Sequence, residues 1–303
     1  MAPPTRTRTV PLGGDRVMTV DDVGDADGAP VLYLHGTPDS RLARHPDDGL
    51  AAEAGVRLLA IDRPGYGGSS PTAGPWSDEW PEAVAADVAA VLDAVGVERC
   101  AVLAWSGGAL TGVALAATLP DRVAALGIVA GLVPRQAFDD PAVRAAGEDR
   151  LAVIELADVV PPGALGDEVA PLLAPFPCDR GLAAEHQAGQ RSAPDAAELA
   201  TVAGGADRMA AALAEAVRPG LAGVGADVEA QARPLPVDLG AVRCDVRLWY
   251  GAADRVAPPA FGHWYAAHLP GASLTVVDGA GHYLAFTAWA EMLATLAAVM
   301  PRP

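Results

Sequence analysis

The residue that points most directly to chemistry is Ser106, which follows the apolar run Cys100–Trp105 and precedes an alanine-rich stretch. Small residues stand two positions before it and two after it, Ala104 and Gly108. In a strand-turn-helix unit, small residues at these positions let the strand and the helix approach closely, and the serine hydroxyl is then presented to a cleft. Ser-Gly-Gly is also typical of an ordinary turn, so this motif alone does not establish a nucleophile. A nucleophilic role for Ser106 therefore depends on partners elsewhere in the chain.

Two later segments supply those partners. Asp254 lies in the loop after the apolar run Val246–Tyr250, and His282 follows the run Ser273–Val277 through a glycine-rich loop. A serine hydroxyl is a poor nucleophile until a base takes its proton, and a histidine oriented by a carboxylate performs that task. The predicted catalytic set is thus Ser106 as nucleophile, His282 as base and Asp254 as the acid.

Asp254 and His282 each have a structural alternative. Asp254 could cap a helix that begins near Pro258, and His282 could be a structural loop histidine. The order of the three residues along the chain favours the catalytic reading, since chymotrypsin-like and subtilisin-like chains present the same groups in other orders.

With this order the chain resembles the α/β-hydrolase superfamily, and the resemblance extends over nearly all of it. The segment His35-Gly36-Thr37-Pro38 is similar to the family's oxyanion turn, and the segment 62–69 is similar to its next strand-end loop. The serine turn, the acid loop and the histidine loop follow in the family's order. The resemblance implies an α/β fold with a doubly wound, mostly parallel sheet and a helical cap insertion.

The resemblance also implies roles for further residues. The backbone N–H groups of Thr37 and Gly107 would receive the oxyanion, and no cofactor or metal would be required. Some relatives take their acid from an earlier strand end, which makes Asp139 and Asp140 an alternative pair that ranks below Asp254. Asp278 is expected to be a turn residue.

Four more residues are candidates for the pocket. His35 and Gly36 belong to the oxyanion turn, where the imidazole would brace the loop instead of acting as a base. Trp105 and Tyr283 flank the serine and the histidine, and each could line an apolar pocket or belong to the core. The other histidines have no identifiable partner and are expected to be ordinary surface or helix residues: His45, His186, His263 and His268.

The elements that would position these residues follow from the apolar pattern. Two alternating segments predict an exposed antiparallel start, and later apolar runs predict strands covered on both faces. Alanine-rich stretches between them have helical spacing, so the middle of the chain predicts βαβ units. The strands are expected at 6–10, 16–20, 31–34, 57–61, 100–105, 123–129, 246–250 and 273–277, and helices at 82–95 and 109–119.

After residue 130 the alternation stops for about a hundred residues, which is far longer than an ordinary loop. The segment 131–236 has 16 acidic residues against 8 arginines, a composition typical of solvated helices. We therefore expect a helical cap at 131–236 on a core formed by 1–130 and 237–303. A cap of this kind would exclude water and select substrates.

Composition excludes several classes of function. A net charge of −17 disfavours nucleic acid and anionic membrane surfaces as partners, and no apolar run is long enough to cross a bilayer. The first residues contain no signal peptide pattern, so a cytoplasmic location is expected. The spacing of Cys100, Cys178 and Cys244 predicts three buried thiols and neither disulfides nor a zinc site.

The identity of the nucleophile limits the reactions that the predicted site could catalyse. An aspartate at position 106 would have indicated dehalogenase or epoxide-hydrolase chemistry, whereas a serine indicates an acyl-enzyme. We expect hydrolysis of a small carboxylic ester with an apolar acyl group. The alternatives are a transacylase or cyclase, a lactonase, a peptidase, a hydrolase of carbon-carbon bonds, or a protein that binds a small ligand without turnover, because a fold does not fix a function.

Overall fold

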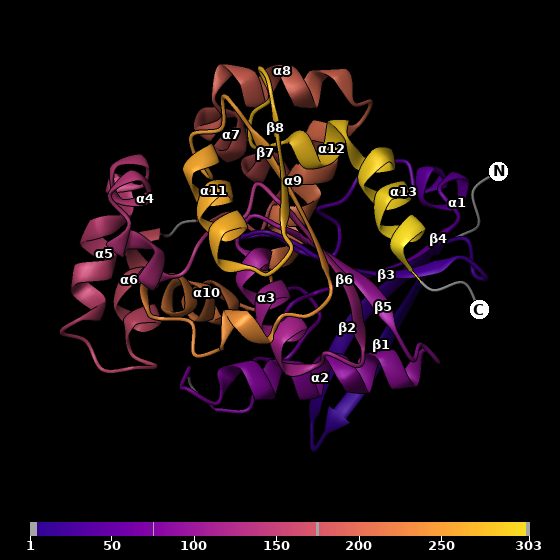
Figure 1. The fold of residues 1–303 in the computed structure, drawn as a ribbon, viewed down its shortest axis with the longest axis horizontal. Coiled ribbons are helices and arrows are strands. Elements are labelled where there is room, and N and C mark those ends of the chain that lie inside the picture. The colour runs from indigo at the N-terminus through magenta and orange to yellow at the C-terminus, as the bar shows by residue number, and fades with distance from the viewer. Residues whose placement is uncertain (1–4, 75, 174–175, 301–303) are drawn as a thin grey trace.

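The computed structural model describes residues 5–74, 76–173 and 176–300. In this part of the chain one sheet contains eight strands in the order β1-β2-β4-β3-β5-β6-β7-β8 (Figure 1). Strands β1 and β2 pair antiparallel, β2 pairs antiparallel with β4, and all other neighbours are parallel. The strands are β1 Arg6–Gly13, β2 Arg16–Gly24, β3 Ala29–Leu34, β4 Val56–Ile61, β5 Cys100–Trp105, β6 Val123–Val129, β7 Asp245–Gly251 and β8 Ser273–Val277.

The central strands are apolar along their whole length because helices cover both faces of the sheet. A Cβ added to Gly112 of helix α3 would contact Ala104 of β5 and Leu126 of β6. A Cβ added to Gly127, the residue after Leu126 in β6, would contact Leu296 of helix α13 on the opposite face. Successive residues of β6 thus face α3 and α13 in turn. The core helices are α1 Gly49–Glu53, α2 Trp80–Ala94, α3 Gly108–Thr118, α11 Pro259–His268, α12 Leu284–Thr287 and α13 Trp289–Val299.

Seven α-helices lie between β6 and β7 in the described ranges. Helices α5, α6 and α10 pack together, and α7 and α8 both pack on α9. Figure 1 shows the first of these groups at one end of the molecule and the second group beside α12. We call this segment the insertion. Its helices are α4 Pro141–Ala146, α5 Leu151–Ala157, α6 Leu165–Leu173, α7 Arg180–Gln190, α8 Ala193–Thr201, α9 Gly205–Ala216 and α10 Ala222–Ala232.

The predicted fold class is confirmed, and all eight predicted strands are present. The first two strands are longer than predicted, since β1 continues to Gly13 and β2 to Gly24. β2 continues because it also pairs with β4, which buries its second half. None of the helices in the described ranges is long and apolar enough to span a membrane.

The prediction of three buried thiols is confirmed for Cys100 but not for Cys178 or Cys244. Cys100 in β5 is buried, and burial raises the pKa of its thiol to about 12. Cys244 is half-buried, and Cys178 is exposed in the connection between α6 and α7. An exposed cysteine is not distinguishable from a buried one in a segment without apolar periodicity.

Candidate active site

Ser106 occupies a sharp turn between β5 and α3. Its φ is +54°, and among the described residues only Ala130 is another non-glycine residue with positive φ. The left-handed region costs a residue with a Cβ about 1–3 kcal/mol, a strain that persists where the surrounding structure enforces it. A Cβ on Gly108 would lie 2.6 Å from the carbonyl oxygen of Leu34, so the close approach of helix to strand requires a glycine there. The turn thus holds Ser106 at the carboxyl end of the sheet.

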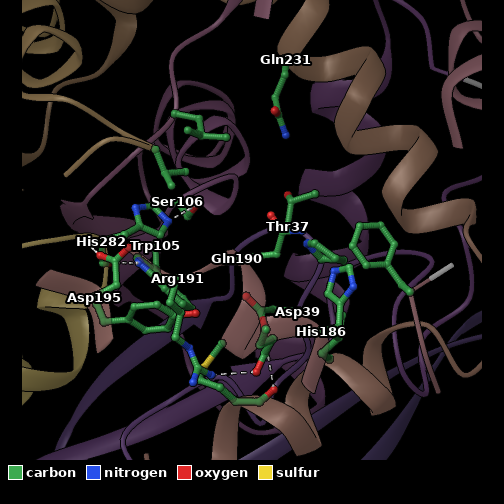
Figure 2. Close-up of a pocket in the computed structure, with 18 of the residues that line it drawn as sticks. Thr37, Asp39, Trp105, Ser106, His186, Gln190, Arg191, Asp195, Gln231 and His282 are labelled. Atoms are coloured by element: carbon green, nitrogen blue, oxygen red, sulfur yellow. Dashed lines mark hydrogen bonds between the residues drawn. The ribbon is translucent and has the colours of Figure 1, made fainter. Parts of the chain in front are cut away.

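The structure brings Ser106, His282 and Asp254 together in a line of hydrogen-bonded groups. The Nε2 atom of His282 lies 3.0 Å from the Oγ of Ser106, and its Nδ1 lies 2.8 Å from the Oδ2 of Asp254. All three residues are at least nine-tenths buried. Figure 2 shows the imidazole of His282 beside Ser106, with the contact between them drawn as a dashed line. The arrangement permits a proton to pass from the serine hydroxyl to the imidazole while Asp254 fixes the tautomer.

Asp254 is held by its own loop. Its Oδ1 accepts hydrogen bonds from the backbone N–H groups of Val256 at 2.7 Å and Ala257 at 2.9 Å, which leaves Oδ2 for His282. The N-cap residue of α11 is Pro258, so Asp254 does not cap that helix. Both carboxylate oxygens of Asp254 are thereby fixed, Oδ1 by the backbone of its own loop and Oδ2 by His282.

The alternative acids are engaged elsewhere. Asp140 caps α4 and accepts a hydrogen bond from the backbone N–H of Ala142 at 2.7 Å. Asp139 is exposed and lies 3.6 Å from a guanidinium nitrogen of Arg135. Asp278 lies in the turn after β8, as expected.

The segment predicted as an oxyanion turn lies directly against the serine turn. A Cβ on Gly107 would overlap the Oγ1 of Thr37, and a Cβ on Gly36 would lie 3.1 Å from the Cβ of Ser106. A side chain at Gly107 would require Thr37 to move, and one at Gly36 would make a tight contact with Ser106, so the two turns approach closely. Thr37 lines the same cavity as Ser106.

His35 is buried beneath this turn and does not line the cavity. Its Nδ1 donates to the carbonyl oxygen of Gly36 at 2.8 Å, and its Nε2 accepts from the backbone N–H of Arg63 at 2.9 Å. Burial and then the charge of Arg63 lower the pKa of His35 well below its ordinary value, so the ring is neutral. The lining of the cavity contains neither His35 nor Gly36, which the sequence put forward as pocket candidates.

A buried ion pair that sequence reasoning missed contacts the segment predicted as an oxyanion turn. Asp227 of α10 accepts hydrogen bonds from Arg63 at 2.5 and 2.6 Å, from the hydroxyl of Tyr66 at 2.6 Å and from the hydroxyl of Thr37. Arg63 also donates to the carbonyl oxygens of His35 and Gly36. The insertion is therefore bonded to the turn that approaches Ser106.

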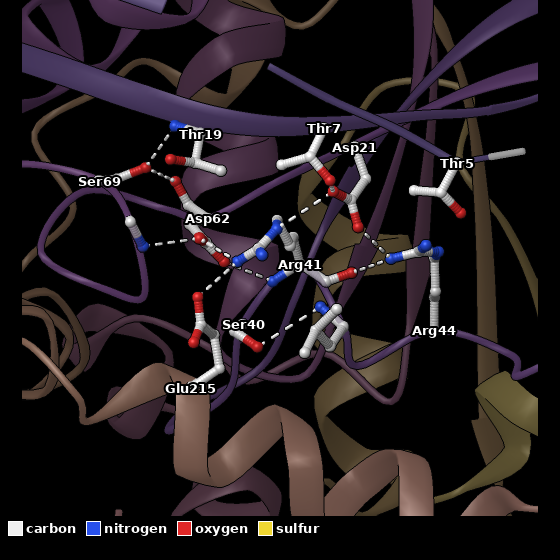
Figure 3. Close-up of polar contacts among 12 residues, drawn as sticks. Thr5, Thr7, Thr19, Asp21, Ser40, Arg41, Arg44, Asp62, Ser69 and Glu215 are labelled. Atoms are coloured by element: carbon white, nitrogen blue, oxygen red, sulfur yellow. Dashed lines mark hydrogen bonds and ion pairs between the residues drawn. The ribbon is translucent and has the colours of Figure 1, made fainter. Parts of the chain in front are cut away.

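A second polar cluster anchors the segment that follows the turn (Figure 3). The guanidinium of Arg41 contacts Asp62 at 2.8 Å, Asp21 at 3.2 Å and Glu215 of α9 at 2.8 Å. The partners raise the pKa of Arg41 above its ordinary value despite the cost of burial. Asp62 also accepts from the backbone N–H groups of Arg41 and Gly68 at 2.7 and 2.8 Å.

The catalytic candidates open into a cavity of about 600 Å³. Of the residues predicted for the site, Thr37, Trp105, Ser106, His282 and Tyr283 line it. Trp105 also belongs to the core, and its indole N–H donates to the carbonyl oxygen of His282 at 3.1 Å. Polar lining residues that sequence reasoning missed are Asp39, Arg150, Gln187, Gln190, Arg191, Asp195 and Gln231.

The sequence predicts His186 to be an ordinary surface or helix histidine. It does lie in a helix, α7, but it lines the cavity and its ring meets that of Phe176 edge to face at 5.4 Å between centroids (Figure 2). No motif surrounds it, and the face that α7 presents to the cavity is set by packing on α9.

A second cavity of about 310 Å³ adjoins the first. The two share residues of the oxyanion turn, Thr37 and Pro38, and also Leu132, Arg150, Phe176 and Gln231. Its remaining lining is almost wholly apolar and comes from β6's end and the insertion: Val133, Phe138, Val153, Ile154, Val169, Val224, Val228 and Ala232, with Asp149 at its edge. An apolar group placed there would lie next to the turn that approaches Ser106.

Two acids, Asp39 of the cavity lining and Glu198 of α8, are partly or wholly desolvated. Burial raises the pKa of Asp39 well above its ordinary value, although the charge of Arg63 acts in the opposite direction, and its Oδ1 has no hydrogen-bond partner. Burial also raises the pKa of Glu198. In the described ranges no group of three or more histidine, cysteine or acidic side chains is arranged to hold a metal ion.

The chain is similar to several known proteins. A family model described as the alpha/beta hydrolase fold matches residues 29–147. Over 123 residues the chain is 39% identical to an epoxide hydrolase B of Mycobacterium tuberculosis. The match covers 40% of this chain and 33% of that protein. Over 106 residues it is 38% identical to a putative carbamate hydrolase of Variovorax paradoxus, which covers 35% of this chain and 39% of that protein. The chain thus matches between a third and two fifths of the length of these curated relatives.

The likeness in structure extends further than the likeness in sequence. A solved alpha/beta hydrolase fold protein from Nakamurella multipartita superposes with a TM-score of 0.64 at 25% identity. That superposition covers 96% of this chain and 99% of the other.

Proposed function

The chain belongs to the α/β-hydrolase superfamily, and from that premise we propose that it is a serine hydrolase that cleaves a carboxylic ester through an acyl-enzyme on Ser106. The observation that carries the proposal is the unbroken line of hydrogen-bonded groups from Ser106 through His282 to Asp254. A serine in a left-handed turn, with a base at hydrogen-bond distance, is the arrangement that activates a hydroxyl.

In the first half of the proposed reaction, the Oγ of Ser106 attacks the ester carbonyl carbon while its proton moves to the Nε2 of His282. The backbone N–H groups of Thr37 and Gly107 stabilise the negative charge that develops on the carbonyl oxygen; the loss of one such donor costs about 2.7–4 kcal/mol. His282 then gives the proton to the departing alkoxide, and the acyl group remains on the serine.

In the second half, His282 takes a proton from a water molecule that attacks the acyl-enzyme. The bond between the serine oxygen and the acyl carbon breaks, the proton returns to Ser106, and a carboxylic acid leaves. Asp254 holds the ring of His282 in place and stabilises the imidazolium. The overall reaction consumes one ester and one water molecule and yields a carboxylic acid and an alcohol.

The proposed substrate is a small ester with an apolar part. The apolar second cavity shares Thr37 and Pro38 with the catalytic cavity, so an apolar acyl or alcohol group could lie there while the carbonyl faces Ser106. Its volume of about 310 Å³ is enough for a small apolar group. We further propose that residues 131–236 act as a cap on a core formed by 1–130 and 237–303, since the insertion supplies most of that lining.

The name of one relative suggests epoxide hydrolysis as a second activity to test. The match with the epoxide hydrolase B spans 40% of this chain. Carboxylate attack on an epoxide carbon would require an aspartate at position 106, where this chain has a serine. We therefore favour acyl chemistry, and an epoxide belongs in the assay as a negative substrate.

The test is turnover of p-nitrophenyl esters of increasing acyl size by wild type, Ser106→Ala and Ser77→Ala. Ser77 is a matched control because its hydroxyl accepts a hydrogen bond from the backbone N–H of Glu79 in an exposed turn and does not line the catalytic cavity. We expect short and branched esters to be hydrolysed by wild type and Ser77→Ala, and no turnover above background by Ser106→Ala. Equal rates in wild type and Ser106→Ala would contradict the proposal.

A further inference from the structure

One side chain of the insertion is bonded directly to the loop that carries the proposed base. The Oδ1 of Asp195, on α8, accepts a hydrogen bond from the backbone N–H of His282 at 2.6 Å, across 87 residues of sequence. Asp195 is 6% exposed, so water competes little for this bond. Hydrogen bonds to an ionised acceptor are stronger than those between neutral groups.

The other oxygen of the same carboxylate is fixed by the start of α8. Oδ2 accepts from the hydroxyl of Ser192 at 2.6 Å and from its backbone N–H at 3.2 Å, and the Ser192 hydroxyl accepts from the backbone N–H of Asp195 at 3.3 Å. Together these bonds form a capping box. A capping box uses groups of its own helix, so the bond from Oδ1 to His282 is additional to what helix α8 needs.

The histidine loop is shaped to receive α8. A Cβ on Gly281 would overlap the Oδ1 of Asp195 and lie 3.2 Å from the Oε2 of Glu198, one helical turn further along α8. Glycine at 281 therefore permits α8 to approach the backbone that precedes the base. After the loop, α8 packs on α12.

We propose that Asp195 is a positioning residue for His282, and that helix α8 of the insertion is thereby part of the catalytic apparatus and not only a cover. The inference rests on the proposed function. The backbone N–H of His282 is the point at which the loop is held, and the imidazole must keep 3.0 Å to Ser106 and 2.8 Å to Asp254 at once. A misplacement of about 1 Å can cost about 100-fold in rate.

Three variants separate positioning from helix stability. Asp195→Ala removes both the cap and the acceptor for His282. Asp195→Asn keeps a carbonyl oxygen that can accept from His282, and Ser192→Ala weakens the cap while leaving the carboxylate in place. The readouts are kcat and KM on a p-nitrophenyl ester, the rate at which a serine-directed phosphonate labels Ser106, and the melting temperature.

We expect Asp195→Ala to lower both kcat and the labelling rate by about 10- to 100-fold with KM changed less than about 3-fold. Asp195→Asn should recover most of this loss. Ser192→Ala should stay within about 3-fold of wild type in rate even where its melting temperature falls as far as that of Asp195→Ala.

Two results would overturn the inference. One is a wild-type kcat and labelling rate in Asp195→Ala. The other is an equal loss in Ser192→Ala and Asp195→Ala, which would assign the effect to the stability of α8. A failure of the proposed function is recognised separately: wild type would then neither turn over esters nor be labelled at Ser106, and the role of Asp195 would fall with it.

Discussion

The Oγ of Ser106 lies 3.0 Å from the Nε2 of His282, although 176 residues separate them in the chain. They meet because β5 and β8 run parallel in one sheet, and the loops after parallel strands gather at the same edge. Asp254, after the intervening strand β7, completes the line from the far side of the imidazole. Chain order and strand order together create the site.

The structure singles out Asp254 among the candidate acids, and substitution tests this choice. Asp254→Asn should lower kcat by up to about 10⁴-fold, because the amide favours the wrong histidine tautomer. Asp139→Asn should leave kcat unchanged, since that carboxylate is exposed and pairs with Arg135. Steady-state kinetics on one ester measures both. A larger loss in the Asp139 variant would assign the acid to the earlier strand end.

Gly107→Ala should disrupt the oxyanion turn without touching the nucleophile. The new Cβ would overlap the Oγ1 of Thr37, so one of the two turns must move. We expect kcat to fall by about 10²- to 10³-fold, as when an oxyanion donor is displaced. The double variant Thr37→Ala/Gly107→Ala removes the overlapping oxygen and should recover part of the rate. If the double variant is no faster than Gly107→Ala, steric displacement of Thr37 is not the cause.

The left-handed backbone at Ser106 predicts a cost in stability that a glycine would relieve. At φ +54° a glycine avoids the clash that any Cβ makes. Ser106→Gly should therefore be more stable than Ser106→Ala by about 1 kcal/mol, or roughly 2–4 °C in melting temperature. Calorimetry of the two inactive variants provides the comparison. Equal melting temperatures would mean that the turn is not strained.

Asp39 predicts a pH-dependent loss of stability. Its folded pKa is raised by burial, so the unfolded chain, with an ordinary aspartate pKa of about 3.9, releases this proton first as pH rises. The folded state loses stability over that range. Asp39→Asn should thus raise the melting temperature by a few degrees, more near pH 8 than near pH 5, and thermal scans at both values decide. A gain that is constant with pH would show that the carboxyl does not titrate as described.

The strands and the segments that end them could be predicted from sequence because their signals are local. β5, β6 and β8 have the predicted bounds, and each ends at a turn or loop residue, namely Ser106, Ala130 and Asp278. Ser106, Asp254 and His282 each follow such a strand, and the shared edge of a parallel sheet brings them together. Their catalytic roles stay predictions until activity is measured.

The insertion could not be predicted in the same detail. Asp195 and Asp227 look like any acid on an acidic helix, and only the packing of α8 and α10 against the core shows that both are buried. The same holds for His186. The sequence predicts a helical segment around it, but it does not predict that this side chain faces the cavity. Helical periodicity predicts that a face is buried, but it does not identify the partner that buries it.

The most direct test of the central claim is to react the protein with a serine-directed fluorophosphonate, map the modified peptide by mass spectrometry, and repeat the reaction with Ser106→Ala. The account predicts one adduct per chain, on the peptide that contains Ser106, and none in the variant. Labelling at another residue, or labelling of Ser106→Ala to the same extent, would contradict the assignment of Ser106 as the nucleophile.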